Sequence, residues 1–123
     1  MLQESFEVRD GVGVFRPVGE CTMVEMVEAI RDAIGRTRAH EARGLLITAR
    51  GVYGFAVPTL IDRFLAIEDW AEEADGMLSV ALVVHPQYIH PRKFGVKVAA
   101  DFGLTGDVFT SEVNARAWLA SKV

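Results

Sequence analysis

The sequence is poor in cysteine, histidine and basic residues, and this scarcity argues against several functions. It has one cysteine, Cys21, and three histidines among 123 residues. A single cysteine excludes an intrachain disulfide, so the chain suits a reducing compartment. Basic residues are also scarce, since 13 Lys and Arg stand against 17 Asp and Glu, a net charge of −4. Because phosphate contacts need a basic surface, this balance argues against general nucleic-acid binding and against binding to anionic membranes.

Long apolar segments are absent as well. No apolar run approaches the length of a membrane span, and the N-terminal MLQESFEVRD lacks the basic and apolar regions of a signal peptide. We therefore expect a cytoplasmic protein. Half of the residues are hydrophobic, and the length suits one compact domain over residues 1–123 with a core of its own.

The chain is expected to open with a β-hairpin. Apolar residues alternate in residues 5–9 and again in residues 12–18, which predicts two strands. Asp10-Gly11 lies between them and is a strong two-residue hairpin signal, since glycine accepts positive φ without strain.

Four helices follow from capping and periodicity. Thr22 and Glu25 form a capping box before a helix that ends near residues 40–43. Thr59–Ala74 reads as a second helix, Pro91 can open a third, and Ser111 can cap a fourth. The second helix is expected to bury Leu60, Ile61, Phe64, Leu65, Ile67 and Trp70, and the fourth Val113, Ala117 and Trp118.

Continuous apolar runs at residues 45–48 and 78–84 predict strands buried on both faces, and residues 107–109 predict a short further strand. Strands that alternate with amphipathic helices indicate an α/β fold. We expect a mixed, mostly parallel sheet of about five strands with four helices and an opening hairpin. The hairpin leaves a sheet edge through which a homodimer could form.

Three stretches carry a family resemblance: DGVGVFRPVGECTMVEMVEAI, GLLITARGVYGF and DVFTSEVNARAWL. Together with the element order, they resemble the SpoIIAA-like branch of the STAS fold, named for sulfate transporters and anti-sigma factor antagonists, in bacterial proteins also described as STAS/SEC14-like. The resemblance covers nearly the whole chain. It implies a SpoIIAA-like (STAS) topology and a non-enzymatic regulatory or protein-interaction module.

One motif of the resembled family is missing. Regulatory STAS proteins are phosphorylated on a serine that lies in an Asp-Ser-x-Gly-like stretch after the middle strand. The corresponding GVYGFAVPTLID, residues 51–62, has no serine and no aspartate before the helix. Thr59 is the nearest hydroxyl, at about the second helical position, where backbone N–H groups favour a phosphate. Two interpretations stay open: phosphorylation at Thr59, or a threonine that merely tolerates a helix N-terminus.

A ligand or partner site is expected beyond the carboxyl ends of the parallel strands. Two loops leave that edge, residues 50–55 and 85–97. Arg92 and Lys93 would lie in the first turn of the third helix, where cations oppose the helix dipole and a bound anion would remove the conflict. The loops form either a pocket for a small anionic or amphipathic ligand, a surface for the acidic face of a partner, or merely a solvated edge. The site residues proposed are Arg50, Tyr53, Phe55, His85, Tyr88, His90, Arg92 and Lys93.

No motif for catalysis, a cofactor or a metal stands in the sequence. Gly51-x-x-Gly54 lacks the lysine and hydroxyl of a phosphate-binding loop, and no nucleophile elbow is present. His85 and His90 have no acid or cysteine beside them, so no metal site is expected. The first interpretation is a non-enzymatic module that acts through an unknown protein partner. The alternative is a carrier or sensor of a small lipid-like or anionic ligand bound at the carboxyl edge of the sheet.

Overall fold

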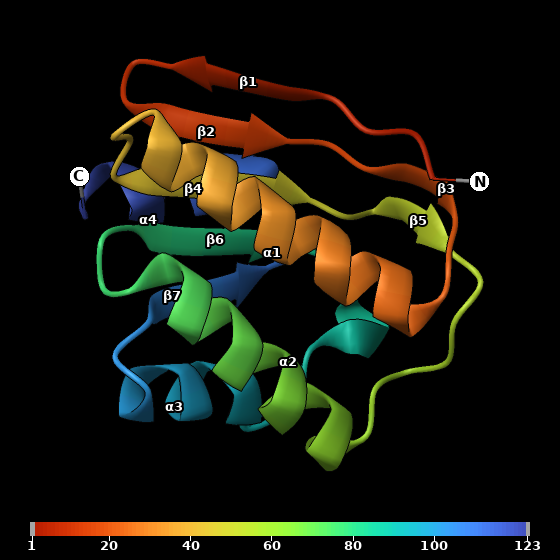
Figure 1. Cartoon of the computed structure of the whole chain (residues 1–123). Helices are drawn as coiled ribbons and strands as arrows, with labels where there is room; N and C mark the ends of the chain where they lie inside the picture. The colour runs from red at the N-terminus through yellow and green to blue at the C-terminus, as the bar shows by residue number, and fades with distance from the viewer. Residues whose placement is uncertain (1, 123) are drawn as a thin grey trace.

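A five-stranded sheet forms the centre of the computed structural model, which describes residues 2–122 (Figure 1). Its strand order is β1 (Phe6–Arg9), β2 (Val12–Phe15), β4 (Gly44–Thr48), β6 (Ser79–Val83) and β7 (Thr105–Phe109). β1 and β2 are antiparallel, and every other neighbouring pair is parallel. The mixed, mostly parallel sheet and the opening hairpin are thereby confirmed.

Asp10 and Gly11 make the hairpin turn with φ of 54° and 77°. Both residues occupy the left-handed region, as the tight turn between two antiparallel strands requires. The turn sets the register in which Arg9 faces Val12, and it leaves β1 as one edge of the sheet.

The second predicted strand is shorter than expected. It stops at Phe15, and a separate strand, β3 (Val18–Glu20), pairs in parallel with β5 (Gly51–Tyr53), which the sequence analysis missed. Pro17 lies at the break. It has no backbone N–H to donate, so the ladder of hydrogen bonds cannot continue unbroken through it.

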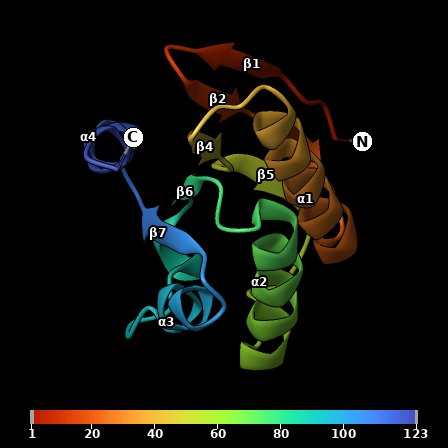
Figure 2. The same cartoon turned by 60° about the vertical axis from the view of Figure 1, so that its left-hand side comes forward.

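Helices cover both faces of the sheet (Figure 2). α1 (Met23–Ala39), α2 (Leu60–Ala74) and α3 (Phe94–Asp101) contribute to one core, and α4 (Glu112–Ala120) contributes to the other. Along β4, Leu45 and Ile47 point into the first core while Leu46 points into the second. Because successive side chains of a strand alternate between its faces, the continuous apolar run fills both cores.

Capping boxes begin two of these helices. Thr22 accepts a hydrogen bond from the Glu25 N–H, and the Glu25 carboxylate accepts one from the Thr22 N–H, at 3.1 and 2.8 Å. Thr59 and Asp62 repeat this arrangement at 3.1 and 3.0 Å. Thr59 is therefore the N-cap of α2 and not its second residue, a correction to the sequence-based placement. Ser111 caps α4 as expected, and its side chain accepts from the Asn114 N–H.

The buried face of α2 differs from the predicted one. Ala66, Ile67, Ala71 and Ala74 are buried and Trp70 is half-buried, because α2 packs against α1 and α3 through its small side chains. The other predicted core residues of this helix are exposed, with exposed fractions of 50% for Leu60, 72% for Ile61, 40% for Phe64 and 56% for Leu65.

The predicted inner face of α4 is also partly wrong. Val113 is 76% exposed and Ala117 is exposed. Ala115 and Leu119 are the residues that α4 buries, and Trp118 packs beside them. The buried positions are four apart along the helix, so α4 touches the sheet along a narrow stripe.

Candidate functional site

The two loops predicted to form a site lie side by side at the carboxyl ends of β4 and β6. His85 Nε2 lies 2.9 Å from the Arg50 carbonyl oxygen. The Phe55 and Tyr88 rings are in contact, with centroids 5.7 Å apart. The parallel pairing of β4 with β6 brings the loops together, since parallel strands end at the same edge.

Two of the cations in these loops, Arg50 and Lys93, bind partners within the chain. Arg50 donates to the Thr110 carbonyl oxygen at 2.6 Å. Lys93 Nζ lies 2.9 Å from the Asp107 carboxylate. The charge of Lys93 is thus matched within the chain, whereas Arg50 donates to a neutral carbonyl.

The third helix starts later than predicted. Pro91 opens a turn instead, closed by a hydrogen bond of 2.8 Å from the Lys93 N–H to the His90 carbonyl oxygen. Lys93 has a φ of 50° and occupies the N-cap, and α3 begins at Phe94. Proline suits the second position of such a turn because its φ is already fixed. Arg92 and Lys93 therefore precede the first helical turn, and the charge of Lys93 at the N-cap is paired with Asp107.

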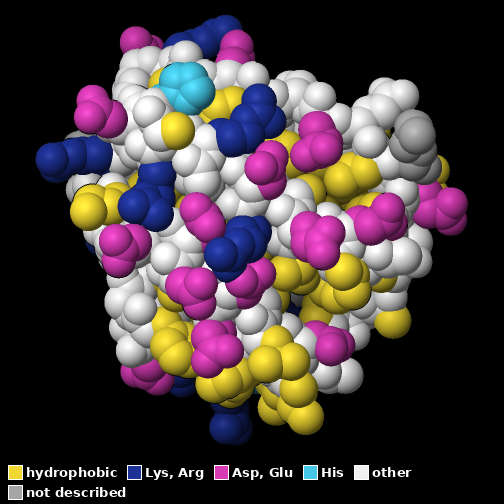
Figure 3. Space-filling model, in the orientation of Figure 1, with side chains coloured by type: hydrophobic (Ala, Val, Ile, Leu, Met, Phe, Trp, Pro, Cys, Tyr) yellow, Lys and Arg dark blue, Asp and Glu magenta, His cyan; other side chains and the backbone are white. Residues whose placement is uncertain are grey.

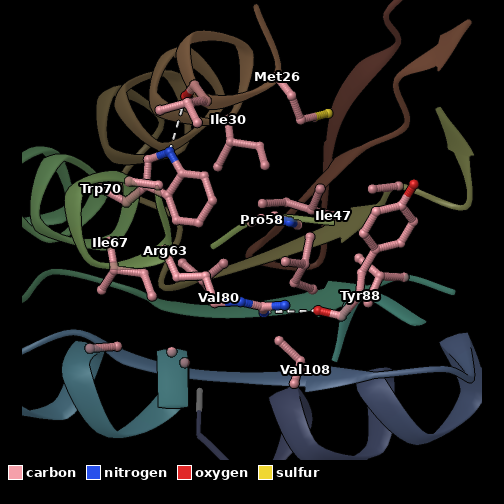
Figure 4. A pocket seen from close by; sticks show the side chains of 18 of the residues that line it. Met26, Ile30, Ile47, Pro58, Arg63, Ile67, Trp70, Val80, Tyr88 and Val108 are labelled. Carbon is pink, nitrogen blue, oxygen red and sulfur yellow. Dashed lines mark hydrogen bonds between the residues drawn. The ribbon is translucent and has the colours of Figure 1, made fainter. Parts of the chain in front are cut away.

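A cavity of about 170 Å³ lies beneath the loops, between the sheet and the helices (Figure 4). Its walls are almost entirely apolar. α1 supplies Met26 and Ile30, α2 supplies Ile67 and Trp70, and the sheet supplies Ile47 and Val80. Of the eight predicted site residues, only Phe55 and Tyr88 line it.

Sequence reasoning missed this cavity because it lies between elements and not in a loop. Small side chains on three of its walls, Ala49, Ala66 and Ala99, leave the space open. Small residues on the inner face of α2 were the available signal, but the larger side chains of the same helix concealed it.

Arg63 is the one cation along the described cavity walls. Its side chain runs from α2 toward the second loop, where Nη1 donates to the Tyr88 carbonyl oxygen at 2.9 Å (Figure 4). Burial lowers the pKa of the Arg63 guanidinium. The two acids of the lining already have partners, because Asp62 caps α2 and Asp107 binds Lys93.

A contiguous apolar surface lies on the outer side of α2, which we call the α2 surface. Phe64 joins it to the end of α3 by an edge-on contact with Phe102, with ring centroids 5.4 Å apart. Hydrophobic side chains gather over this part of the molecule, with acidic side chains beside them (Figure 3). The α2 surface comprises Val57, Leu60, Ile61, Phe64, Leu65 and Phe102, which are 40–72% exposed.

His85 and His90 are turned toward different backbone groups. His85 meets the Arg50 carbonyl, and His90 Nδ1 accepts from the Arg92 N–H at 3.0 Å. Within residues 2–122, no group of three or more His, Cys, Asp or Glu side chains is arranged to hold a metal ion.

Cys21 is 4% exposed, and burial raises the pKa of its thiol. It therefore serves as a small core residue. Among residues 2–122, no helix has the length and apolar character needed to cross a membrane.

Two solved structures share this architecture. An anti-sigma factor antagonist from Mycobacterium paratuberculosis superimposes with a TM-score of 0.61 at 18% identity, over 98% of this chain and 95% of that chain. A protein of the DUF3478 family with a SpoIIAA-like fold, from Shewanella loihica, gives a TM-score of 0.51 at 18% identity, over 96% and 93%. No protein-family model matches the sequence, and no curated protein matches it. The chain thus has the SpoIIAA-like, STAS-type α/β fold, which confirms the predicted topology.

Proposed function

We propose that this chain is a non-catalytic regulatory module of the STAS type that acts by binding a partner protein through the α2 surface. Its fold supports the general role, since one similar structure is an anti-sigma factor antagonist. The exposed apolar side chains of α2 support the choice of surface and are the observation that carries the proposal.

The α2 surface has the character of an interface. Single exposed apolar residues are ordinary on proteins, but contiguous apolar patches mark interaction sites. Ile61 and Leu65 lie four residues apart on one helical face and are 72% and 56% exposed. Asp62 and Glu68 are exposed on the same helix. A partner with an apolar groove or ridge and a basic rim would complement this arrangement.

Regulation by phosphate would have to work differently from the serine switch of the resembled proteins. The Thr59 hydroxyl caps α2, so a phosphate there would replace a capping oxygen with a dianion beside Asp62. Phosphorylation at Thr59 stays a prediction, which phosphoproteomic analysis of the purified protein would test.

Substitutions on the α2 surface test the main proposal. Ile61→Asp and Leu65→Asp place charges at the centre of the surface, and Val113→Asp places one at a 76% exposed site on α4. The three variants and the wild type are immobilised and exposed to lysate of the producing cell, and the captured proteins are quantified by mass spectrometry. We expect a protein captured by the wild type and Val113→Asp to be lost with the α2 variants, and to bind again when purified. Capture that the α2 variants leave unchanged would refute the proposal.

The alternative role, a carrier or sensor of a small lipid-like or anionic ligand bound at the carboxyl edge of the sheet, finds no support in the comparisons. At that edge the charge of Lys93 is already paired with Asp107. We place the regulatory role in the cytoplasm, because the free thiol of Cys21 suits a reducing compartment. Self-association through the edge of β1 also stays a prediction, which sedimentation velocity would test.

A further inference from the structure

We propose that the cavity beneath α2 binds the hydrocarbon tail of a small monocarboxylate, with the carboxylate held by Arg63. This site is separate from the α2 surface, because it lies on the inner side of the same helix. The proposal does not depend on partner binding.

The size and lining of the cavity fit a hydrocarbon. Apolar cavities of about 150 Å³ stay dry and take up small hydrocarbons such as benzene. The volume here is about 170 Å³, and the lining offers water few polar partners. A tail on the order of six to eight carbons would fill the cavity, with the carbons next to the carboxylate near its mouth. Filling the cavity would remove a void from the core and give its walls the contacts they lack.

The helix above the cavity is held at its margins. At one end the Trp70 indole donates to the Val27 carbonyl oxygen at 3.0 Å, which ties α2 to α1. Arg31 of α1 pairs with Glu73 of α2 at 3.2 Å. Arg63 and Tyr88 make the tie at the other end (Figure 4). The contacts that position α2 thus leave the space beneath its middle open, and Phe55, Pro58 and Tyr88 surround the end where Arg63 lies.

Arg63 is suited to an anionic head group. A guanidinium has five N–H donors, and Arg63 uses one of them on a neutral carbonyl. Among residues 2–122 it has no ion-pair partner within 4.0 Å. The lowered pKa of this guanidinium fits a cation that has lost water without gaining an anion. A carboxylate can accept two parallel bonds from it. Asp62 lines the same cavity, so a singly charged head group suits the site better than a phosphate dianion.

Isoleucine methyl groups make the binding visible by NMR. Ile30, Ile47 and Ile67 line the cavity, whereas Ile61 lies on the outer side of α2. We expect octanoate to shift the three interior methyl signals and to leave Ile61 unchanged. From butanoate to hexanoate the affinity should rise about four-fold per methylene, which corresponds to about 0.8 kcal/mol. Octanoate that shifts Ile61 alone, or no interior signal, would overturn the proposal.

Head-group recognition is tested with Arg63→Gln and with octanol. We expect Arg63→Gln to weaken octanoate binding at least ten-fold and to leave octanol binding unchanged. Arg92→Gln is the matched control, because Arg92 is an exposed cation of the rim that does not line the cavity. Equal loss in both variants, or octanol binding as tightly as octanoate to the wild type, would overturn the assignment of Arg63.

Cavity filling provides a second test. Val80→Phe adds volume from the sheet, and Ala66→Leu adds it from α2, since both side chains line the cavity. Each folded variant, verified by its dispersed methyl spectrum, should lose octanoate binding. Val113→Phe adds comparable volume on the exposed side of α4 and should bind as the wild type does. Wild-type affinity in either folded filling variant would overturn the site.

Discussion

Arg16 and Glu112 form a two-bond ion pair across 96 positions of the chain, with Nη1 to Oε1 at 2.8 Å and Nη2 to Oε2 at 3.1 Å. Arg16 also donates to the Thr48 hydroxyl at 3.1 Å. The pair thus ties the first turn of α4 to the ends of β2 and β4. The hydrogen bonds from Arg16 lower the pKa of Glu112 from its ordinary 4.5 to about 2.

This pair should make stability depend on acid pH. The folded pKa of Glu112 is depressed, so its contribution is present above pH 4.5 and is lost as the pH falls toward 2. Both side chains are about one-third exposed or more, so the contribution is about 1 kcal/mol after screening. Urea unfolding at pH 7 and pH 3 compares the wild type with Glu112→Gln. We expect the difference in unfolding free energy to shrink at pH 3, and an equal difference at both pH values would contradict this role.

Removing the cap of α2 should weaken the fold. Thr59→Ala deletes the hydroxyl that accepts from the Asp62 N–H, and such losses cost about 1 kcal/mol of unfolding free energy. Thr59→Ser keeps the hydroxyl and should retain most of that stability in the same urea titration. If Ala and Ser unfold at the same urea concentration, the hydroxyl contributes nothing.

Gly13 of β2 lies close to Thr37 of α1. A Cβ built there would lie 2.7 Å from the Thr37 hydroxyl oxygen, closer than ordinary contacts allow. We expect Gly13→Ala to reduce the unfolding free energy by about 1–3 kcal/mol, as overpacking does. Thr37→Ala removes the obstacle, so the double variant should lose less than the sum of the two single variants. Additive losses would show that the clash has another origin.

Cys21 should resist modification while the protein is folded. Its thiol is buried, and burial raises its pKa, so little thiolate is available to react. We expect a disulfide reagent to label it slowly at pH 8 in buffer and rapidly in denaturant. Equally fast labelling in both conditions would show that the first turn of α1 opens readily.

Local signals predicted much of this fold. The turn at Asp10-Gly11 and the cap at Thr22 depend on neighbouring residues alone, so the sequence contains the whole interaction. The buried face of α2 could not be inferred in this way. Its sequence offers a stripe of large apolar residues that includes Ile61 and Leu65, and a stripe of smaller ones around Ala66. Packing against α1 and α3 selects the smaller stripe, and periodicity alone does not contain that information.

The candidate site likewise has a part that could be predicted from the sequence and a part that could not. The meeting of Phe55 with Tyr88 follows from the direction of parallel strands, so the adjacency of the loops was predictable. The role of Pro91 was not, because proline suits both the first turn of a helix and a tight turn. The contact of Arg63 with Tyr88 was not predictable either, because it forms only once α2 and the loop of residues 85–97 are brought together.

The cavity beneath α2 should make the folded state sensitive to hydrostatic pressure. On unfolding, water fills the volume that the cavity occupied. The unfolded chain and its solvent therefore occupy less volume than the folded chain and its solvent. Hydrostatic pressure should therefore disrupt the packing of α2 before it disturbs the second core beneath α4, whose residues do not line the cavity. Any molecule that settles in the void would make the protein stiffer under compression.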